Sequence, residues 1–147
     1  MDQPAVLSLL NGCTIKDATV VVMGDGSLWT ARSAWTDALR PLIQEYTGSQ
    51  RRAGKDKTYA AHDRPYREIL AESAFADVKE HTIDVERPWT PQTVIGYPYS
   101  TSFASRPLFG ARLQEFEERA HALLTEHADA DGLIEHARFD VLIARRP

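Results

Sequence analysis

Three side chains of this sequence could move a proton in a reaction: Asp25, His62 and Tyr99. Asp25 follows an apolar run, residues 19–23, and open α/β sheets bind their ligands outside the carboxyl ends of strands. A bond from Asp25 to the backbone of its own turn explains this residue equally well. An unperturbed histidine titrates near neutral pH, so His62 could act as acid or base, although an exposed loop position is the ordinary alternative.

Aromatic and hydroxyl side chains concentrate around Tyr99, in the segment 97–103. Loops rarely gather such side chains without a use, and an aromatic-lined pocket suits a flat small molecule. The substrate-binding residues predicted on this basis are Trp29, Tyr59, Tyr97, Ser100, Ser102 and Phe103.

Three strands and about five helices are predicted to position these residues. Apolar runs and alternation predict the strands at 19–23, 77–87 and 136–144. Helical spacing predicts helices over 3–11 and 33–47, after Pro65, between Thr90 and Pro98, and from Pro107 onward. Ser33 is a candidate helix cap, Pro41 is expected to kink or split its helix, and Pro98 is expected to end one.

Composition narrows the class of protein. The chain has 147 residues, a net charge of −4 and a single cysteine, Cys13. An acidic balance argues against a dedicated nucleic-acid binder, and one cysteine fits a reducing cytoplasm. No apolar run approaches the ~20 residues that span a bilayer. No two histidines have the i, i+4 spacing of a zinc motif, so we expect no metal site.

The pair Gly24 and Gly26 is the nearest approach to a dinucleotide-binding loop. That motif needs a third glycine at a position that holds Trp29 here. The sequence therefore predicts a tight turn at this place and no cofactor-binding residue.

The order of these segments resembles the C-terminal half of a class I S-adenosylmethionine (SAM) dependent small-molecule methyltransferase. The resemblance covers nearly the whole chain, and the motifs that carry it are Met1-Asp2-Gln3-Pro4, RRAG at 51–54, WT at 89–90, STSFAS at 100–105 and ARRP at 144–147. It implies an α/β fold of the truncated Rossmann-like methyltransferase type, with a single domain over 1–147. It also implies a small mixed three-stranded sheet whose last strand lies antiparallel between the other two.

The resemblance has consequences for cofactor and substrate. The Gly-rich loop and the acidic ribose-binding residue of the family have no counterpart in this sequence. We therefore expect this chain to bind SAM only with an N-terminal half or a partner supplied. In the family the segment corresponding to 97–103 lies over the substrate, and His62 follows Tyr59 in a loop that resembles the substrate-side insertion.

An open strand edge is also implied. In the full family the strand corresponding to 19–23 pairs with a fourth strand, which this sequence lacks. An uncharged, β-branched edge pairs with other chains unless it is covered. We therefore predict a homodimer through the 19–23 edge or the 3–11 helix, with self-coverage by that helix or a loop as the alternative.

Three functions remain open. One is a small-molecule enzyme of specialised (secondary) metabolism that keeps the acceptor pocket and performs acid–base cyclisation or condensation without SAM. Another is a SAM-dependent methyltransferase fragment or subunit that needs a missing half. The last is a non-catalytic small-molecule-binding module. The sequence favours the first, acting in the cytoplasm on a small aromatic metabolite.

Overall fold

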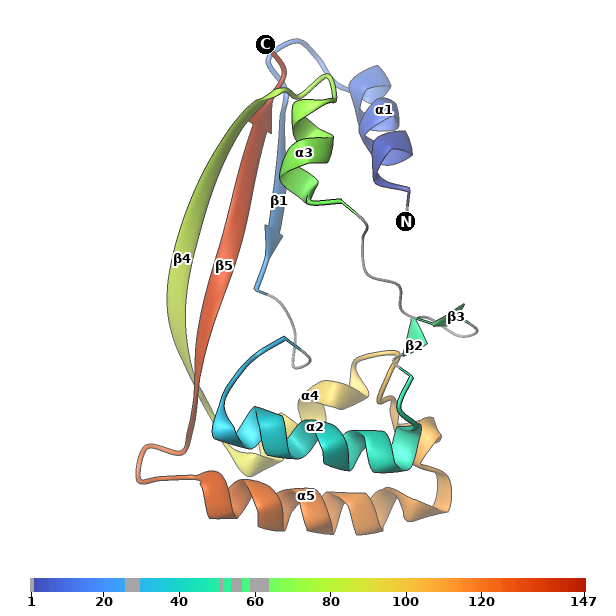
Figure 1. Cartoon of the computed structure of the whole chain (residues 1–147), viewed down its shortest axis with the longest axis vertical. Helices are drawn as coiled ribbons and strands as arrows, with labels where there is room; N and C mark the ends of the chain where they lie inside the picture. Colours follow the sequence, from blue (N-terminus) through green and yellow to red (C-terminus); the bar gives the residue numbers. More distant parts are fainter. Residues whose placement is uncertain (1, 26–29, 51, 54–56, 59–63) are drawn as a thin grey trace. The chain divides into compact units, whose positions relative to one another are not determined.

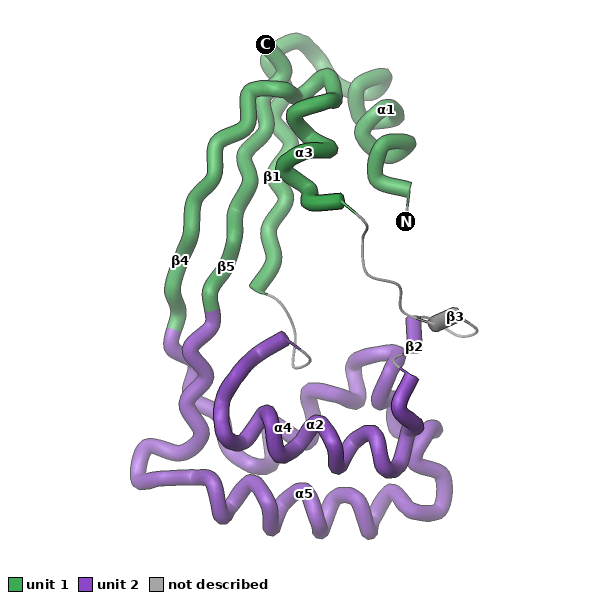
Figure 2. The backbone as a smooth tube through the Cα atoms, in the orientation of Figure 1, with its two compact units in different colours: residues 1–25, 61–85, 138–147 green, residues 26–60, 86–137 purple. Residues whose placement is uncertain are grey.

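The computed structural model describes residues 2–25, 30–50, 52–53, 57–58 and 64–147. The chain divides into two compact units, which Figure 2 distinguishes by colour. Unit 1 comprises residues 1–25, 61–85 and 138–147, and unit 2 comprises residues 26–60 and 86–137. Two long strands, β4 (Asp77–Trp89) and β5 (Leu133–Arg145), contribute to both units.

Unit 1 combines two helices with the sheet (Figure 1). Its further elements are α1 (Gln3–Cys13), β1 (Thr19–Gly24) and α3 (Tyr66–Ala71). The side chain of Asp2 caps α1 by accepting a hydrogen bond from the backbone N–H of Ala5 at 3.0 Å. The predicted strand 19–23 and helix 3–11 are thus present, each one or two residues longer.

The strand order of the sheet is β1-β5-β4. β1 and β5 are antiparallel, in a register that runs from Thr19 opposite Arg145 to Gly24 opposite Asp140. The predicted central place of the last strand is confirmed, but the predicted mixed sheet is wrong. Both neighbours of β5 run opposite to it, so every hydrogen-bonded strand pair in the described sheet is antiparallel.

One face of this sheet packs against the helices of unit 1. Val20 and Val22 of β1 point to that face, because alternate residues of a strand share a side. They pack on a buried cluster formed by Leu7, Ile69, Leu70, Phe75, Leu142 and Ala144. Since β1 residues 21 and 23 point the other way, the helices do not cover them.

Unit 2 is mainly helical. Its elements are α2 (Ala34–Thr47), the two-residue strands β2 (Arg52–Ala53) and β3 (Lys57–Thr58), α4 (Pro91–Tyr99), the 3₁₀ helix η1 (Arg106–Arg112) and α5 (Leu113–His127). α2, α4 and α5 surround a core that includes Leu39, Ile43 and Phe116, each with no exposed surface.

Local sequence explains where two of these helices begin. Ser33 caps α2 in a reciprocal box with Thr36, and Thr90 caps α4 in the same way with Thr93. The predicted cap at Ser33 and the start at Thr90 are confirmed. At Pro41 the helix does not split, since α2 continues as one helix through this residue. α4 ends at Tyr99, one residue after Pro98, close to the predicted end.

Two glycines with positive φ flank α5 in the sequence, one on each side. Gly110 has non-helical backbone angles (φ 54°, ψ −134°), so the single helix predicted from Pro107 is wrong: η1 precedes a separate α5. Gly132 has φ +87° and closes a turn in which Asp129 and Gly132 exchange backbone hydrogen bonds. A Cβ at Gly132 would lie 2.9 Å from the Trp89 carbonyl oxygen, so only glycine fits there.

Candidate functional site

Tyr97 is an exposed candidate residue, with 41% of its surface accessible. Its ring meets the Trp89 ring edge-on, with centroids 5.8 Å apart. The indole N–H of Trp89 donates to Glu135 Oε2 at 2.7 Å, and Arg87 donates to Oε1 of the same carboxylate at 3.1 Å. The hydrogen bonds to Glu135 therefore hold Trp89 in place beneath Tyr97, and an aromatic molecule could stack on the exposed Tyr97 ring.

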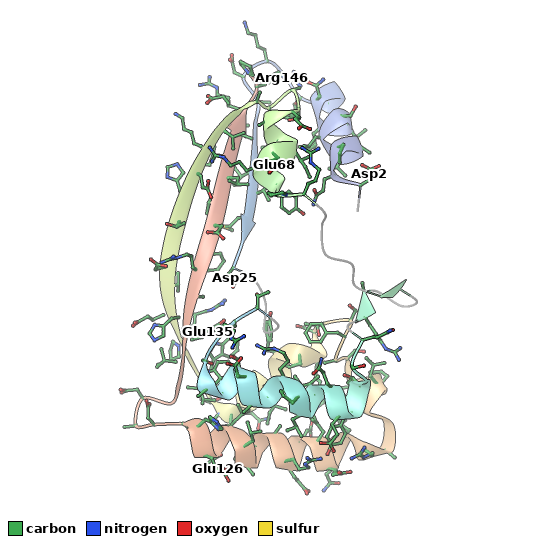
Figure 3. The ribbon with its side chains drawn as sticks, in the orientation of Figure 1. Asp2, Asp25, Glu68, Glu126, Glu135 and Arg146 are labelled. Atoms are coloured by element: carbon green, nitrogen blue, oxygen red, sulfur yellow. The ribbon has the colours of Figure 1, made fainter. Side chains whose placement is uncertain are left out.

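Glu135 is a residue that the sequence analysis missed. Its side chain is 16% exposed, and Figure 3 labels it on β5. Glu135 precedes the predicted strand 136–144 and lies between Ile134 and His136, so no pattern in the sequence marked its carboxylate as largely buried. Its role here is to orient Trp89, which in turn supports Tyr97.

Tyr99 has quite different neighbours. Its hydroxyl donates to Glu117 Oε1 at 3.0 Å, and its ring meets Phe109 edge-on at 5.8 Å. The guanidinium of Arg106 lies 4.9 Å from the ring centroid. Burial, followed by the hydrogen bond to Glu117, raises the pKa of the Tyr99 hydroxyl above its ordinary value. Tyr99 thus keeps its proton at neutral pH and is suited to donate a hydrogen bond.

The other residues of the segment mainly bond to backbone or fill the core. Ser100 Oγ donates to the Tyr97 carbonyl at 2.8 Å, and Ser102 Oγ donates to the Arg52 carbonyl at 3.4 Å. Phe103 is 6% exposed and belongs to the core of unit 2. Tyr97 thus contacts Trp89 with an exposed ring, whereas Tyr99 and Phe103 both pack in the core of unit 2.

Asp25 directly follows β1 at its carboxyl end, in unit 1, and is half-buried (Figure 3). Its place in the chain is the one that the sequence predicts. The remaining predicted site residues, Trp29, Tyr59 and His62, lie outside the described residues.

A groove in unit 1 is a second candidate site. It has a volume of about 280 Å³ and follows β1 between α1 and α3. Its lining residues are Gln3, Val6, Leu7, Leu10, Val20, Val21, Val22, Met23, Tyr66 and Leu70, none of which is charged. Val21 is 56% and Met23 is 62% exposed, so β1 presents apolar surface next to this groove.

Gln3 is unusual among the residues of this groove. It is only 6% exposed, and its side-chain nitrogen has no hydrogen-bond partner among the described residues. A buried polar group without a partner costs about 1–3 kcal/mol. The groove therefore contains one polar group that an additional molecule could satisfy.

The described residues contain no group of three or more histidine, cysteine, aspartate or glutamate side chains that could hold a metal ion. Within the same described residues, every helix is too short or too polar to cross a membrane. Comparison of the chain with protein-family models, with curated proteins and with solved structures finds no match.

Proposed function

We propose that this chain is the acceptor-binding part of a SAM-dependent small-molecule methyltransferase, active when a SAM-binding partner or N-terminal half is supplied. The observation that carries the proposal is the strand order β1-β5-β4, with the C-terminal strand antiparallel at the centre. This is the order that the sequence resemblance implies, and strand order depends on contacts far apart in the chain.

The described residues do not fit SAM itself. A helix N-terminus with free backbone N–H groups is the usual place for a nucleotide-like ligand. The N-terminus of α2, the first helix after β1, is instead closed by Ser33 and Thr36, and that of α4 by Thr90 and Thr93. We therefore assign the cofactor to the partner and derive no step through it in this chain.

The part assigned to this chain is binding of the acceptor, a small aromatic metabolite. Tyr97 offers an exposed ring for stacking, and the bonds of Trp89 to Glu135 keep that surface in place. The alternative of SAM-independent acid–base chemistry stays a prediction. The Tyr99 hydroxyl is one of the three groups predicted to move a proton in that chemistry. It already donates a hydrogen bond to Glu117, and its pKa is raised, so it is less suited to give up its proton.

The test is to prepare this chain together with the polypeptide encoded immediately upstream in its gene, fused or separate, and to titrate SAM by calorimetry. We expect micromolar binding by the joint preparation and none by this chain alone. The joint preparation should also transfer a labelled methyl group to an aromatic acceptor.

Tyr97→Ala is the matched test of the acceptor surface. It should raise the KM for the acceptor severalfold and leave the affinity for SAM unchanged, because Tyr97 is assigned only to the acceptor. Tyr66, in unit 1, is partly buried and lines the β1 groove, so Phe139→Ala on β5 serves as the control. Micromolar SAM binding by this chain alone, or none by the joint preparation, would contradict the proposal.

A further inference from the structure

The last turn of α1 carries an asparagine–glycine pair at the surface of unit 1. Asn11 is the single asparagine of the chain, and Gly12 follows it. Both residues lie inside α1, and both are exposed. This pair favours deamidation, because glycine has no Cβ to hinder attack of its backbone nitrogen on the preceding side chain. A reactive pair is therefore in contact with water at the end of this helix.

The reaction of the pair needs water and no cofactor. The backbone nitrogen of Gly12 attacks Cγ of Asn11, and a C–N bond closes a five-membered succinimide. The side-chain nitrogen of Asn11 takes up the proton of the Gly12 amide and leaves as ammonia. Water then opens the ring at one of its two carbonyls, which leaves either aspartate or isoaspartate at position 11.

A helical backbone opposes the first step. In an α-helix each N–H bonds to the carbonyl four residues earlier, and the backbone angles are fixed near their helical values. Ring closure requires rotation of the backbone between Asn11 and Gly12 away from those values. The last turn of α1 must therefore open before the nitrogen of Gly12 can attack.

The C-terminal segment of the chain holds this turn closed. Arg146 donates to the carbonyl oxygen of Asn11 at 2.6 Å and to that of Thr14 at 3.2 Å. Thr14 Oγ1 accepts from Arg146 at 2.9 Å and donates to the Leu10 carbonyl at 2.7 Å. The last turn of α1, all of it described, has no basic residue of its own. The Arg146 guanidinium thus supplies the positive charge that stabilises a helix C-terminus.

We propose that Asn11 is a deamidation site, and that Arg146 holds the last turn of α1 closed against this reaction. The aspartate product adds a negative charge at the negative end of the helix dipole. In the isoaspartate product the main chain runs through the former side-chain carbon, so the carbonyl that Arg146 binds is displaced. Since ammonia is lost, the end of α1 is released irreversibly. The reaction uses no residue assigned to the acceptor and does not depend on the proposed function.

The test follows the mass of the purified chain during storage at mildly alkaline pH, with peptide mapping to place the change at position 11. The replacement of NH by O raises the mass by about one dalton. We expect the folded chain to react at least about tenfold more slowly than the same chain in urea, because α1 must open first.

Substitutions of Arg146 test its part in the protection. Arg146→Ala should speed the reaction of the folded chain about fivefold or more and leave the rate in urea unchanged. Arg146→Lys keeps the charge but loses the planar fork of donors, so its rate should lie between these two, and it replaces the alanine variant if that one does not fold. Arg145→Ala is the matched control and should leave the rate unchanged, because Arg145 forms an exposed pair with Asp17.

Gly12→Ala tests the chemistry separately from the fold. A Cβ at Gly12 would have no heavy atom within 4 Å, so alanine fits in α1. Its methyl group hinders the attack, and the rate should fall severalfold in urea, where no helix contributes. The deamidated chain, once separated, should exchange its α1 amides with deuterium faster than the fresh chain. Asn11→Asp, which adds the charge without the extra backbone atom, should show a smaller increase.

Three results would overturn the proposal. One is a folded chain that deamidates as fast as the chain in urea. Another is a folded Arg146→Ala variant that reacts no faster than the unmodified chain. The last is a deamidated chain whose α1 amides are as well protected as before. None of these measurements involves SAM or an acceptor, so their failure is distinct from failure of the methyltransferase proposal.

Discussion

The two units differ in how completely they cover their own apolar side chains. Among the described residues, the exposed large hydrophobics of unit 1 are Leu9, Ile15, Val21, Met23 and Ile83, whereas Tyr97 is the one in unit 2. Unit 2 buries its aromatic side chains against one another, as with Phe109 and Phe116, whose ring centroids are 4.3 Å apart. Among the described residues, unit 2 therefore covers its large apolar side chains more completely than unit 1 does.

Polar contacts join elements within each of the two units. In unit 2, Tyr46 joins α2 to α5 by donating to Glu115 at 2.9 Å, while Arg112 lies 4.2 Å from the Tyr46 ring centroid. Arg119 of α5 also donates to Glu45 of α2 at 2.9 Å. Unit 1 also has ion pairs between its elements, such as that of Arg67 in α3 with Glu80 in β4 at 2.7 Å. Unit 2 thus ties its helices together on the outside as well as through the core.

The largest effect expected from this comparison concerns the core of unit 2. Phe116→Ala removes a ring with no exposed surface and should lower the free energy of unfolding by about 3–5 kcal/mol. Urea unfolding followed by tryptophan fluorescence measures it, because Trp35 and Trp89 belong to unit 2. Val21→Ala, at a residue 56% exposed in unit 1, should change the free energy by less than about 0.5 kcal/mol. Equal costs at the two positions would contradict the contrast between the units.

A smaller effect is expected where the C-terminal segment holds α1 in unit 1. Arg146, labelled in Figure 3, donates to the carbonyl oxygens of Asn11 at 2.6 Å and Thr14 at 3.2 Å, at the end of α1. Arg146→Ala should cost about 1–3 kcal/mol, because these carbonyls lose a charged donor. Hydrogen exchange should show α1 opening more often. Arg145→Ala is the matched control, since the Arg145 side chain makes an exposed 3.6 Å pair with Asp17, and losing this pair should cost little.

The smallest expected effect is a loss of stability of unit 2 at low pH. Hydrogen bonds from Arg112, and then from Tyr46, lower the pKa of Glu115 to about 2. A carboxyl whose pKa is lower when folded stabilises the protein above its unfolded value, near 4.5, and this stabilisation is lost as the pH falls towards 2. The urea midpoint should therefore decline between pH 4.5 and 2, and less steeply in Glu115→Gln. An unchanged slope in that variant would mean that Glu115 does not couple the helices of unit 2.

Much of the local structure was predictable because it depends on residues a few positions apart. Ser33 and Thr36, or Thr90 and Thr93, lie within one helical turn, so their capping boxes can be recognised in the sequence. Whether Pro41 and Pro98 end their helices was harder to predict. A proline removes a hydrogen bond, and packing of the surrounding helix, which sequence spacing does not reveal, decides whether the helix continues.

The candidate site was less predictable than the fold. Tyr97, Tyr99 and Phe103 are neighbours in sequence and were grouped as one pocket, yet α4 and the segment after it turn them toward Trp89, Phe109 and the core of unit 2. Gln3 was overlooked because nothing in its sequence neighbourhood marks it as buried. Its burial results from β1 and α3, which follow later in the chain.

The sequence by itself determined the cap at Ser33, the helix start at Thr90 and the positions of the three main strands. These follow from backbone preferences and from the periodicity of apolar residues, which are local properties. Only the tertiary structure decided that two units form, that Tyr99 bonds to Glu117, and that one edge of β1 remains next to an uncharged groove. Those features depend on contacts between residues far apart in the chain. Local sequence preferences do not distinguish one such contact from another, and packing and burial in the folded chain decide which of them form.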